Sequence, residues 1–113
     1  MSDRQLLLVD DDEANTLTLS ALLEDEGYTV LCASSLPEAE RRLAEARGLV
    51  AALIDLNLGD ESGLSLAPRV RAVAPAARIV LLTGAPEGLE GNSGVDAVFG
   101  KSGAFDALLK LLS

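Results

Sequence analysis

Five short apolar segments recur along this chain, and their spacing restricts its possible folds more than any other feature. They are residues 6–9, 29–32, 50–54, 79–82 and 95–99. Most are apolar at every position, which is typical of strands buried on both faces of a parallel sheet. The segments between them carry helix signals, so helices are expected on both faces of the sheet. The sequence therefore predicts a single α/β domain.

The first helix is expected over residues 13–26, directly after the first strand. Asp11 or Asp12 can cap its amino end, and Gly27 can end it. Four apolar residues are expected on its inward face: Ala14, Leu17, Ala21 and Leu22.

Two further helices have clear sequence signals. Ser35 precedes Glu38 by three residues, as in a capping box, and Gly48 can close the helix that follows. Near the carboxyl end, apolar residues recur at i, i+3, i+4 and i+7, which is typical of a helix packed on a sheet. These residues are Phe105, Leu108, Leu109 and Leu112.

Two other segments conflict with a regular helix. Pro68 lies inside residues 63–73, where a proline removes a backbone hydrogen bond, so that helix is expected to start late or to kink. Residues 84–94 are near the lower limit for a crossover between parallel strands. They contain residues unfavourable in helices, namely Gly84, Pro86, Gly88, Gly91 and Gly94. The fourth helix is therefore expected to be a single turn near residues 86–90, or absent.

Composition excludes several functions. The net charge is −9, so no electropositive face is expected and direct nucleic-acid binding is not predicted. Cys32 is the sole cysteine, which excludes an internal disulfide, and no apolar run has the length of a membrane span. These features predict a cytoplasmic protein in a reducing compartment. The chain has no histidine, so it cannot itself carry a phosphohistidine. If it takes part in phosphotransfer from such a group, the donor must be another protein or domain.

Polar residues follow four of the predicted strands. Asp10 and Asp11 follow the first strand, Asp55 the third, Thr83 the fourth and Lys101 the fifth. Doubly wound sheets bind ligands beyond the carboxyl ends of their strands, where the strand order reverses. If the order is 2-1-3-4-5, as in flavodoxin-like folds, the three aspartates share one site.

Three carboxylates in one site favour a bound cation. Their mutual repulsion opposes ionisation unless a hard cation lies between them. Mg²⁺ meets this requirement and keeps open positions for phosphoryl oxygens. Taken singly, each polar residue has an ordinary explanation as a helix cap, turn residue, strand end or surface charge. The whole set favours phosphoryl chemistry, whereas Asp12 is assigned to capping alone.

The stretches LLLVDDDE, LIDLNLGDESGLSL and IVLLTG, followed by Lys101, resemble the receiver domain of two-component response regulators. The resemblance covers residues 5–112. It implies that Asp55 accepts a phosphoryl group, that Asp11 binds Mg²⁺ directly, and that Asp10 binds it through water. It also implies that Asn57 offers its backbone carbonyl to the metal.

The same resemblance implies roles for the remaining site residues and for the partners. Thr83 would donate a hydrogen bond to a phosphoryl oxygen, and Lys101 would pair first with Asp55 and then with the phosphoryl group. The phosphodonor would be a histidine kinase or a histidine phosphotransfer protein. The domain would promote its own phosphorylation and dephosphorylation and would switch an output partner that the sequence does not identify. Self-association into a homodimer is compatible with the sequence.

The chain departs from the family pattern at the two turns near the site. Gly59 stands where a proline is usual, and Asp60 and Glu61 follow it, so a more flexible and more acidic loop is expected. Ser102 follows Lys101 in place of a proline with a cis peptide bond. A cis bond before a residue other than proline costs about 2.5–4 kcal/mol, so this turn is expected to be trans or rearranged.

A third departure affects how the signal leaves the site. Val98 stands where many receivers carry a tyrosine or phenylalanine, and its neighbour Phe99 must face the other way along a strand. The usual coupling between that aromatic residue and Thr83 is therefore not expected. Because the fourth helix is expected to be short or absent, we expect the signal to be read near the loops of Asp55 and Thr83, or by a partner that orders residues 84–94.

Two alternatives remain open on the sequence alone. A pseudo-receiver would keep the fold and bind partners without phosphorylation; the altered turn at Lys101 and the presence of Val98 favour it, whereas the intact acidic set opposes it. A phosphatase of the haloacid dehalogenase type also uses an aspartate at a strand end with Mg²⁺. Such a phosphatase needs a second aspartate where this chain has Asn57, which cannot act as a general acid.

Overall fold

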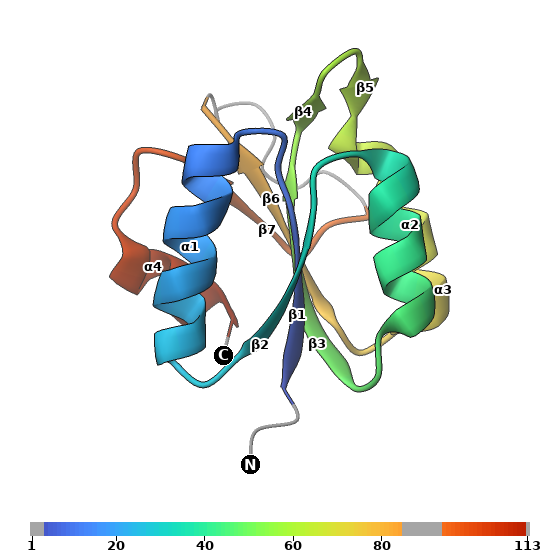
Figure 1. The fold of residues 1–113 in the computed structure, drawn as a ribbon, viewed down its shortest axis with the longest axis horizontal. Helices are drawn as coiled ribbons and strands as arrows, with labels where there is room; N and C mark the ends of the chain where they lie inside the picture. Colours follow the sequence, from blue (N-terminus) through green and yellow to red (C-terminus); the bar gives the residue numbers. More distant parts are fainter. Residues whose placement is uncertain (1–3, 85–93, 113) are drawn as a thin grey trace.

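A five-stranded parallel sheet forms the centre of the computed structural model, which describes residues 4–84 and 94–112 (Figure 1). The strands of this sheet are β1 (Gln5–Val9), β2 (Thr29–Ala33), β3 (Leu49–Asp55), β6 (Arg78–Thr83) and β7 (Ala97–Gly100). They lie in the order β2-β1-β3-β6-β7. Counted along the chain, this is the predicted order 2-1-3-4-5, so the predicted fold class is confirmed.

Helices cover both faces of the sheet. Helices α1 (Glu13–Asp25) and α4 (Phe105–Leu112) lie on one face, and α2 (Leu36–Glu45) and α3 (Ala67–Val73) lie on the other (Figure 1). Alternate residues of β1 enter the two cores: Leu6 and Leu8 pack on the α1 and α4 side, whereas Leu7 and Val9 pack on the α2 and α3 side. Both faces of the strand are buried, which explains its continuous apolar sequence. No helix within residues 4–84 or 94–112 is long and apolar enough to cross a membrane.

Side-chain caps set the starts of the first two helices. The Asp12 carboxylate accepts hydrogen bonds from the backbone amides of Ala14 and Asn15, which confirms its assignment to capping. The Ser35 hydroxyl accepts from the Glu38 amide at 3.3 Å. The Glu38 carboxylate reaches back one residue further than a standard capping box, and it accepts from the Ser34 amide at 2.7 Å.

The helix that contains Pro68 begins late, as predicted. A 3₁₀ helix spans Gly63–Leu66, and α3 follows it from Ala67, with Pro68 in its first turn. Proline is tolerated there because the first helical amides have no partner within the helix. The predicted turn at residues 86–90 lies outside the residues that the structure describes.

The inward face of α1 differs from the predicted one. Leu23 is fully buried, and Leu19 packs against the same core one turn earlier. A further turn back, the Asn15 side chain hydrogen-bonds to Asp10, so these three residues define the inner face. The residues predicted to face inward are instead exposed: Ala14, Leu17, Ala21 and Leu22. That prediction was wrong because apolar spacing alone did not reveal the polar contact of Asn15.

The loop after Asp55 forms a regular β-hairpin. Strand β4 (Asn57–Leu58) pairs antiparallel with β5 (Glu61–Ser62), and Gly59 begins the turn with a φ of 64°. Glycine adopts such a φ without steric cost. The expected acidic loop is therefore present, but as a paired hairpin rather than as a loose connection.

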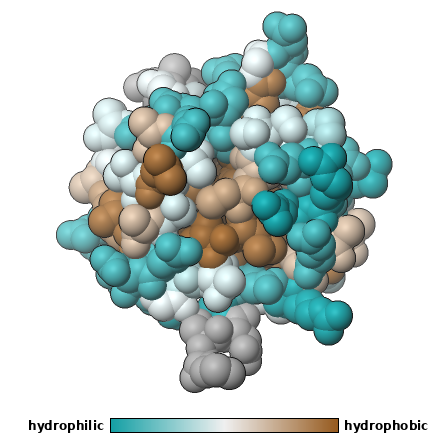
Figure 2. Space-filling view, viewed as in Figure 1, coloured by the Kyte–Doolittle hydropathy of each residue, from teal (hydrophilic) through white to brown (hydrophobic). Residues whose placement is uncertain are grey.

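Strand β2 forms one edge of the sheet. Figure 2 shows apolar surface between α1 and α2, over this strand, and its residues Val30, Leu31 and Cys32 are half-buried. The Arg42 guanidinium donates a hydrogen bond to the Cys32 carbonyl at 3.1 Å. This contact satisfies one backbone group on an edge that could otherwise pair with another strand.

Candidate functional site

The three predicted carboxylates meet at the carboxyl end of the sheet. Val9 of β1 pairs with Ile54 of β3, so the residues that follow them, Asp10 and Asp55, are neighbours. Asp10 is 1% exposed and Asp55 3%, whereas Asp11 lies on the surface. Carboxylate oxygens of all three residues lie within 4.8 Å of one another. The predicted convergence of these carboxylates is therefore present in the structure.

Lys101 supplies the positive charge that faces this cluster. Its Nζ lies 2.8 Å from Asp55 Oδ2 and 3.7 Å from Asp10 Oδ2. Its backbone amide donates to the Thr83 carbonyl at 2.8 Å, which places the turn after β7 beside the end of β6. The described residues contain no cis peptide bond, so the bond between Lys101 and Ser102 is trans, as expected. The ammonium thus reaches the cluster without the usual proline.

Thr83 and Asn57 lie next to Asp55 from two directions. Leu82 of β6 pairs with Asp55, and Thr83, which is 2% exposed, is the next residue in the strand. The Asn57 amide donates to Asp55 Oδ1 at 3.1 Å. The structure therefore brings all six predicted site residues to one end of the sheet.

Two residues that were not predicted as site residues bind the carboxylates. The Asn15 side-chain amide donates to Asp10 Oδ2, and the Gly59 backbone amide donates to Asp11 Oδ2 at 3.1 Å. Asn15 is the third residue of α1, and side chains in a first turn point back toward the helix start, which is a signal that could have found it. No local signal pointed to Gly59, because its partner is 48 residues away in the chain.

The surroundings raise the pKa of both Asp55 and Lys101, which opposes the charged form of Asp55 and favours that of Lys101. Burial raises the pKa of Asp55 above its usual range, and the neighbouring Asp10 adds to this effect, although hydrogen bonds from Lys101 and Asn57 oppose it. Burial acts to lower the pKa of Lys101, but its hydrogen bond to Asp55 and the charges of Asp10, Asp55 and Asp11 raise it. Lys101 therefore stays protonated at neutral pH, whereas burial opposes the ionisation of Asp55.

The donor set fits a hard divalent cation. Opposite ligands of one Mg²⁺ ion are about 4.2 Å apart, since each bond is about 2.1 Å. The carboxylate oxygens of Asp10, Asp11 and Asp55, within 4.8 Å of one another, need only a small adjustment to reach one ion. A cation there would offset the negative charge that Lys101 alone does not balance.

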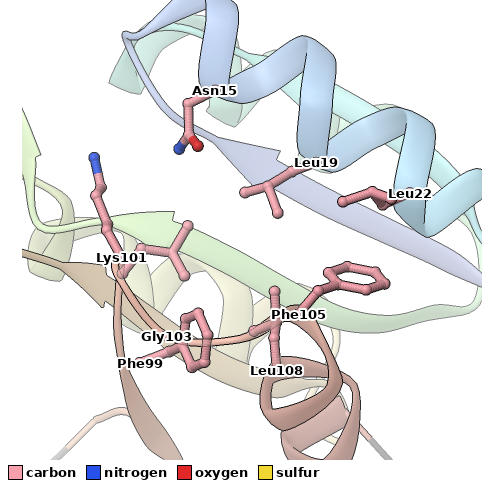
Figure 3. Close-up of a pocket in the computed structure, with 9 residues that line it drawn as sticks. Asn15, Leu19, Leu22, Phe99, Lys101, Gly103, Phe105 and Leu108 are labelled. Atoms are coloured by element: carbon pink, nitrogen blue, oxygen red, sulfur yellow. The ribbon is translucent and has the colours of Figure 1, made fainter.

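A cavity of about 160 Å³ lies beside the site, between α1 and α4 (Figure 3). Asn15 and Lys101 lie at one end of it, and its walls are apolar and include Leu19 and Phe99. Phe99 packs in the core on the α1 and α4 side, and neighbouring strand residues face opposite ways. Phe99 therefore does not take the place of an aromatic residue at Val98, as expected.

The sequence matches the family model of the response regulator receiver domain over residues 6–113. The alginate biosynthesis transcriptional regulatory protein AlgB of Pseudomonas aeruginosa is 40% identical over 94% of this chain and 22% of its own length. The photosynthetic apparatus regulatory protein RegA of Cereibacter sphaeroides is 41% identical over 74% of this chain and 45% of its own length. This chain thus spans less than half of either relative.

Solved structures of similar fold include two that carry ligands. A response regulator protein from Burkholderia pseudomallei with a phosphorylated aspartic acid, a calcium ion and citrate has a TM-score of 0.88 and 31% identity, over 97% of this chain and 66% of that one. TrrA from Thermotoga maritima, in complex with Mg²⁺ and BeF, has a TM-score of 0.81 and 26% identity, over 95% of this chain and 94% of that one.

Proposed function

This chain belongs to the response regulator receiver domain family, and on that premise we propose that residues 1–113 form one receiver domain that is phosphorylated on Asp55. The observation that carries the proposal is the placement of Asp55: it is buried, and Lys101 lies 2.8 Å from one of its oxygens. A burial-raised pKa and an adjacent ammonium group are typical of a carboxylate kept for chemistry rather than for stability.

The proposed reaction transfers a phosphoryl group from a phosphohistidine. A carboxylate oxygen of Asp55 forms a bond to phosphorus, the bond from phosphorus to the donor nitrogen breaks, and its electron pair leaves with the imidazole. The product is an aspartyl phosphate. Lys101 then pairs with the phosphoryl oxygens instead of the carboxylate, and the Thr83 hydroxyl donates to one of them.

Mg²⁺ is the proposed cofactor of this reaction. Asp11 and Asp55 would hold it directly, Asp10 through water, and Asn57 through its backbone carbonyl. The clustering of the three carboxylates supports this set, and the hydrogen bond from Asn57 to Asp55 keeps the start of the hairpin beside them. When bound, the ion supplies positive charge that offsets the repulsion between the cluster and an incoming phosphoryl group.

The proposed partners follow from the chemistry that this chain lacks. It contains no histidine, so the donor is a histidine kinase or a histidine phosphotransfer protein. The curated relatives AlgB and RegA are named as regulatory proteins and are more than twice as long as the stretch that this chain covers. We propose that the output function lies in another segment of a longer protein or in another protein. We also propose that the domain acts in the cytoplasm and promotes its own phosphorylation and dephosphorylation. Self-association into a homodimer stays a prediction.

Intact-mass analysis after incubation with a small phosphodonor tests this function. The protein should gain one phosphoryl group with Mg²⁺ and none after chelation, and Asp55→Asn should gain none. Asp12→Asn is a matched control, because asparagine also caps helices and Asp12 lies outside the cluster. Absence of the mass gain, or an equal gain in Asp55→Asn, would replace this function with that of a pseudo-receiver.

A further inference from the structure

The β4–β5 hairpin is fixed to the sheet at its base. Leu58 is 5% exposed and packs in the core on the α2 and α3 side. The Gly63 amide donates to the Leu56 carbonyl at 2.8 Å. Gly63 approaches the Asp55 backbone so closely that a Cβ there would lie 2.0 Å from the Asp55 carbonyl oxygen. The hairpin therefore holds its backbone amides at set positions relative to Asp55.

Two of these amides, two residues apart, bind two different carboxylates of the cluster. The Asn57 amide donates to Asp55 Oδ1, and the Gly59 amide donates to Asp11 Oδ2, each at 3.1 Å. The first contact is local, whereas the second joins the hairpin to the loop after β1. The hairpin thus bridges the two loops that supply the carboxylates.

Asp11 needs such a contact more than its neighbours do. Asp10 and Asp55 are held by burial and by Lys101, whereas Asp11 is exposed and faces like charges within 4.8 Å. Repulsion and hydration both favour turning its carboxylate away into water. The Gly59 amide opposes this rotation. A carboxylate has about four acceptor positions, so one amide leaves the group able to bind a cation.

We propose that the Gly59 amide is a positioning group that holds Asp11 toward the cation site and couples the hairpin to the cation. This inference rests on the proposed Mg²⁺ site and adds a residue that acts on the metal only through Asp11. Coupling is reciprocal, so the hairpin strengthens cation binding and the cation in turn strengthens the contact between the Gly59 amide and Asp11. The hairpin is then expected to be more firmly held when the cation is bound than when the site is empty.

Substitutions at Gly59 separate the amide from the backbone shape. Gly59→Pro removes the N–H group but also forces φ to about −65°, so Gly59→Ala, which keeps the N–H group and disfavours the native φ of 64°, is its control for backbone shape. Gly59→Asn keeps the N–H group and tolerates a positive φ. A side chain fits at this position, because a Cβ on residue 59 would meet no atom within 4 Å beyond its chain neighbours. In Mg²⁺ titrations followed by calorimetry or NMR, Gly59→Pro should bind about three- to tenfold more weakly than Gly59→Ala, the range expected for one partly exposed hydrogen bond to a charged group. Gly59→Asn should stay within about twofold of the unmodified protein.

A second measurement uses the unmodified hairpin and does not depend on the folding of Gly59→Pro. In the metal-free protein, hydrogen exchange of the Gly59 amide should be slow, and saturating Mg²⁺ should slow it further. Asp11→Ala should speed this exchange about fivefold or more, the size expected when one hydrogen bond is lost. Asp60→Asn, which changes a neighbouring exposed charge, should leave the exchange rate unchanged.

The possible outcomes are distinct. The positioning role would be overturned if Gly59→Pro bound Mg²⁺ no more weakly than Gly59→Ala, or if Gly59→Asn lost as much affinity as Gly59→Pro. It would also be overturned if Gly59 exchange were insensitive to Asp11→Ala. Each of these results would leave the proposed function intact. If the unmodified protein bound no Mg²⁺, the proposed function would fail, and this inference would fail with it.

Discussion

Asp55→Asn should make the metal-free protein more stable at neutral pH. At an effective dielectric constant of 20, the attraction between Lys101 and Asp55 at 2.8 Å is about 6 kcal/mol, and the repulsion between Asp10 and Asp55 within 4.8 Å is at least about 3.5 kcal/mol. About a third of the Lys101 side chain is exposed, so water weakens the attraction, whereas both carboxylates are buried. Desolvation of Asp55 adds several kcal/mol against the charged form.

The replacement amide keeps the contact with Asn57 and loses the one with Lys101. Its oxygen can still accept from the Asn57 amide, which places its nitrogen where Asp55 Oδ2 lies, 2.8 Å from Lys101 Nζ. That nitrogen can donate to Asp10, and Lys101 can turn toward Asp10, which already lies 3.7 Å from its Nζ. We therefore expect the free energy of unfolding to rise by about 1–2 kcal/mol, in line with the gain often found when a functional residue is removed.

The gain should depend on pH in a defined direction. Burial raises the pKa of Asp55 in the folded protein above its unfolded value of about 3.9. Such a group contributes stability below the unfolded pKa, and this contribution is lost as the pH rises through the folded pKa. The Asp55→Asn variant has no such loss, so its advantage should be complete at pH 7.5 and should vanish near pH 4.

Urea denaturation followed by circular dichroism, in the presence of a chelator and at steps from pH 7.5 to pH 4, measures this difference. Asp12→Asn is the control, since it also removes a negative charge near the site. Adding Mg²⁺ should stabilise the unmodified protein more than Asp55→Asn. The reasoning would be refuted if Asp55→Asn were less stable at pH 7.5, or if its gain were the same at every pH.

Two further predictions test packing and a second acidic contact. Leu23→Ala should lower the free energy of unfolding by about 2–5 kcal/mol because Leu23 is fully buried. Leu17→Ala, at a site 63% exposed, should change it by less than about 0.5 kcal/mol. A larger loss in Leu17→Ala than in Leu23→Ala, measured by urea denaturation, would support the inward face of α1 predicted from the sequence. Burial acts to raise the pKa of Asp96, but hydrogen bonds from the Ile79 amide and Arg71 lower it overall. Ionised Asp96 therefore stabilises the fold above its unfolded pKa of about 3.9, and this contribution is lost as the pH falls through its pKa in the folded protein. Asp96→Ala should therefore cost about 1 kcal/mol at pH 7, and a cost that did not shrink on acidification would contradict this assignment.

The sequence alone determined the strands of the sheet and the edge of the sheet at which the site lies. Strands buried on both faces need continuous apolar runs, and this requirement is local enough to be visible without a structure. The carboxyl ends of parallel strands meet at one edge of the sheet, so Asp10, Asp55 and Thr83 could be grouped once the strands were identified. The late start of α3 was equally predictable, because Pro68 acts on its own backbone.

The tertiary structure decided the contacts that orient those residues. The rotation of α1 depends on the contact of Asn15 with Asp10, just after β1, and on the packing of Leu23 against the sheet, so apolar spacing within the helix did not predict it. Lys101 reaches two carboxylates through a turn that lacks the usual proline, which follows from the anchoring of its amide on β6. The amide of Gly59 binds Asp11 across 48 residues, because the hairpin folds back over the end of β1. Distances between segments far apart in the chain are set by packing, and a linear pattern does not contain them.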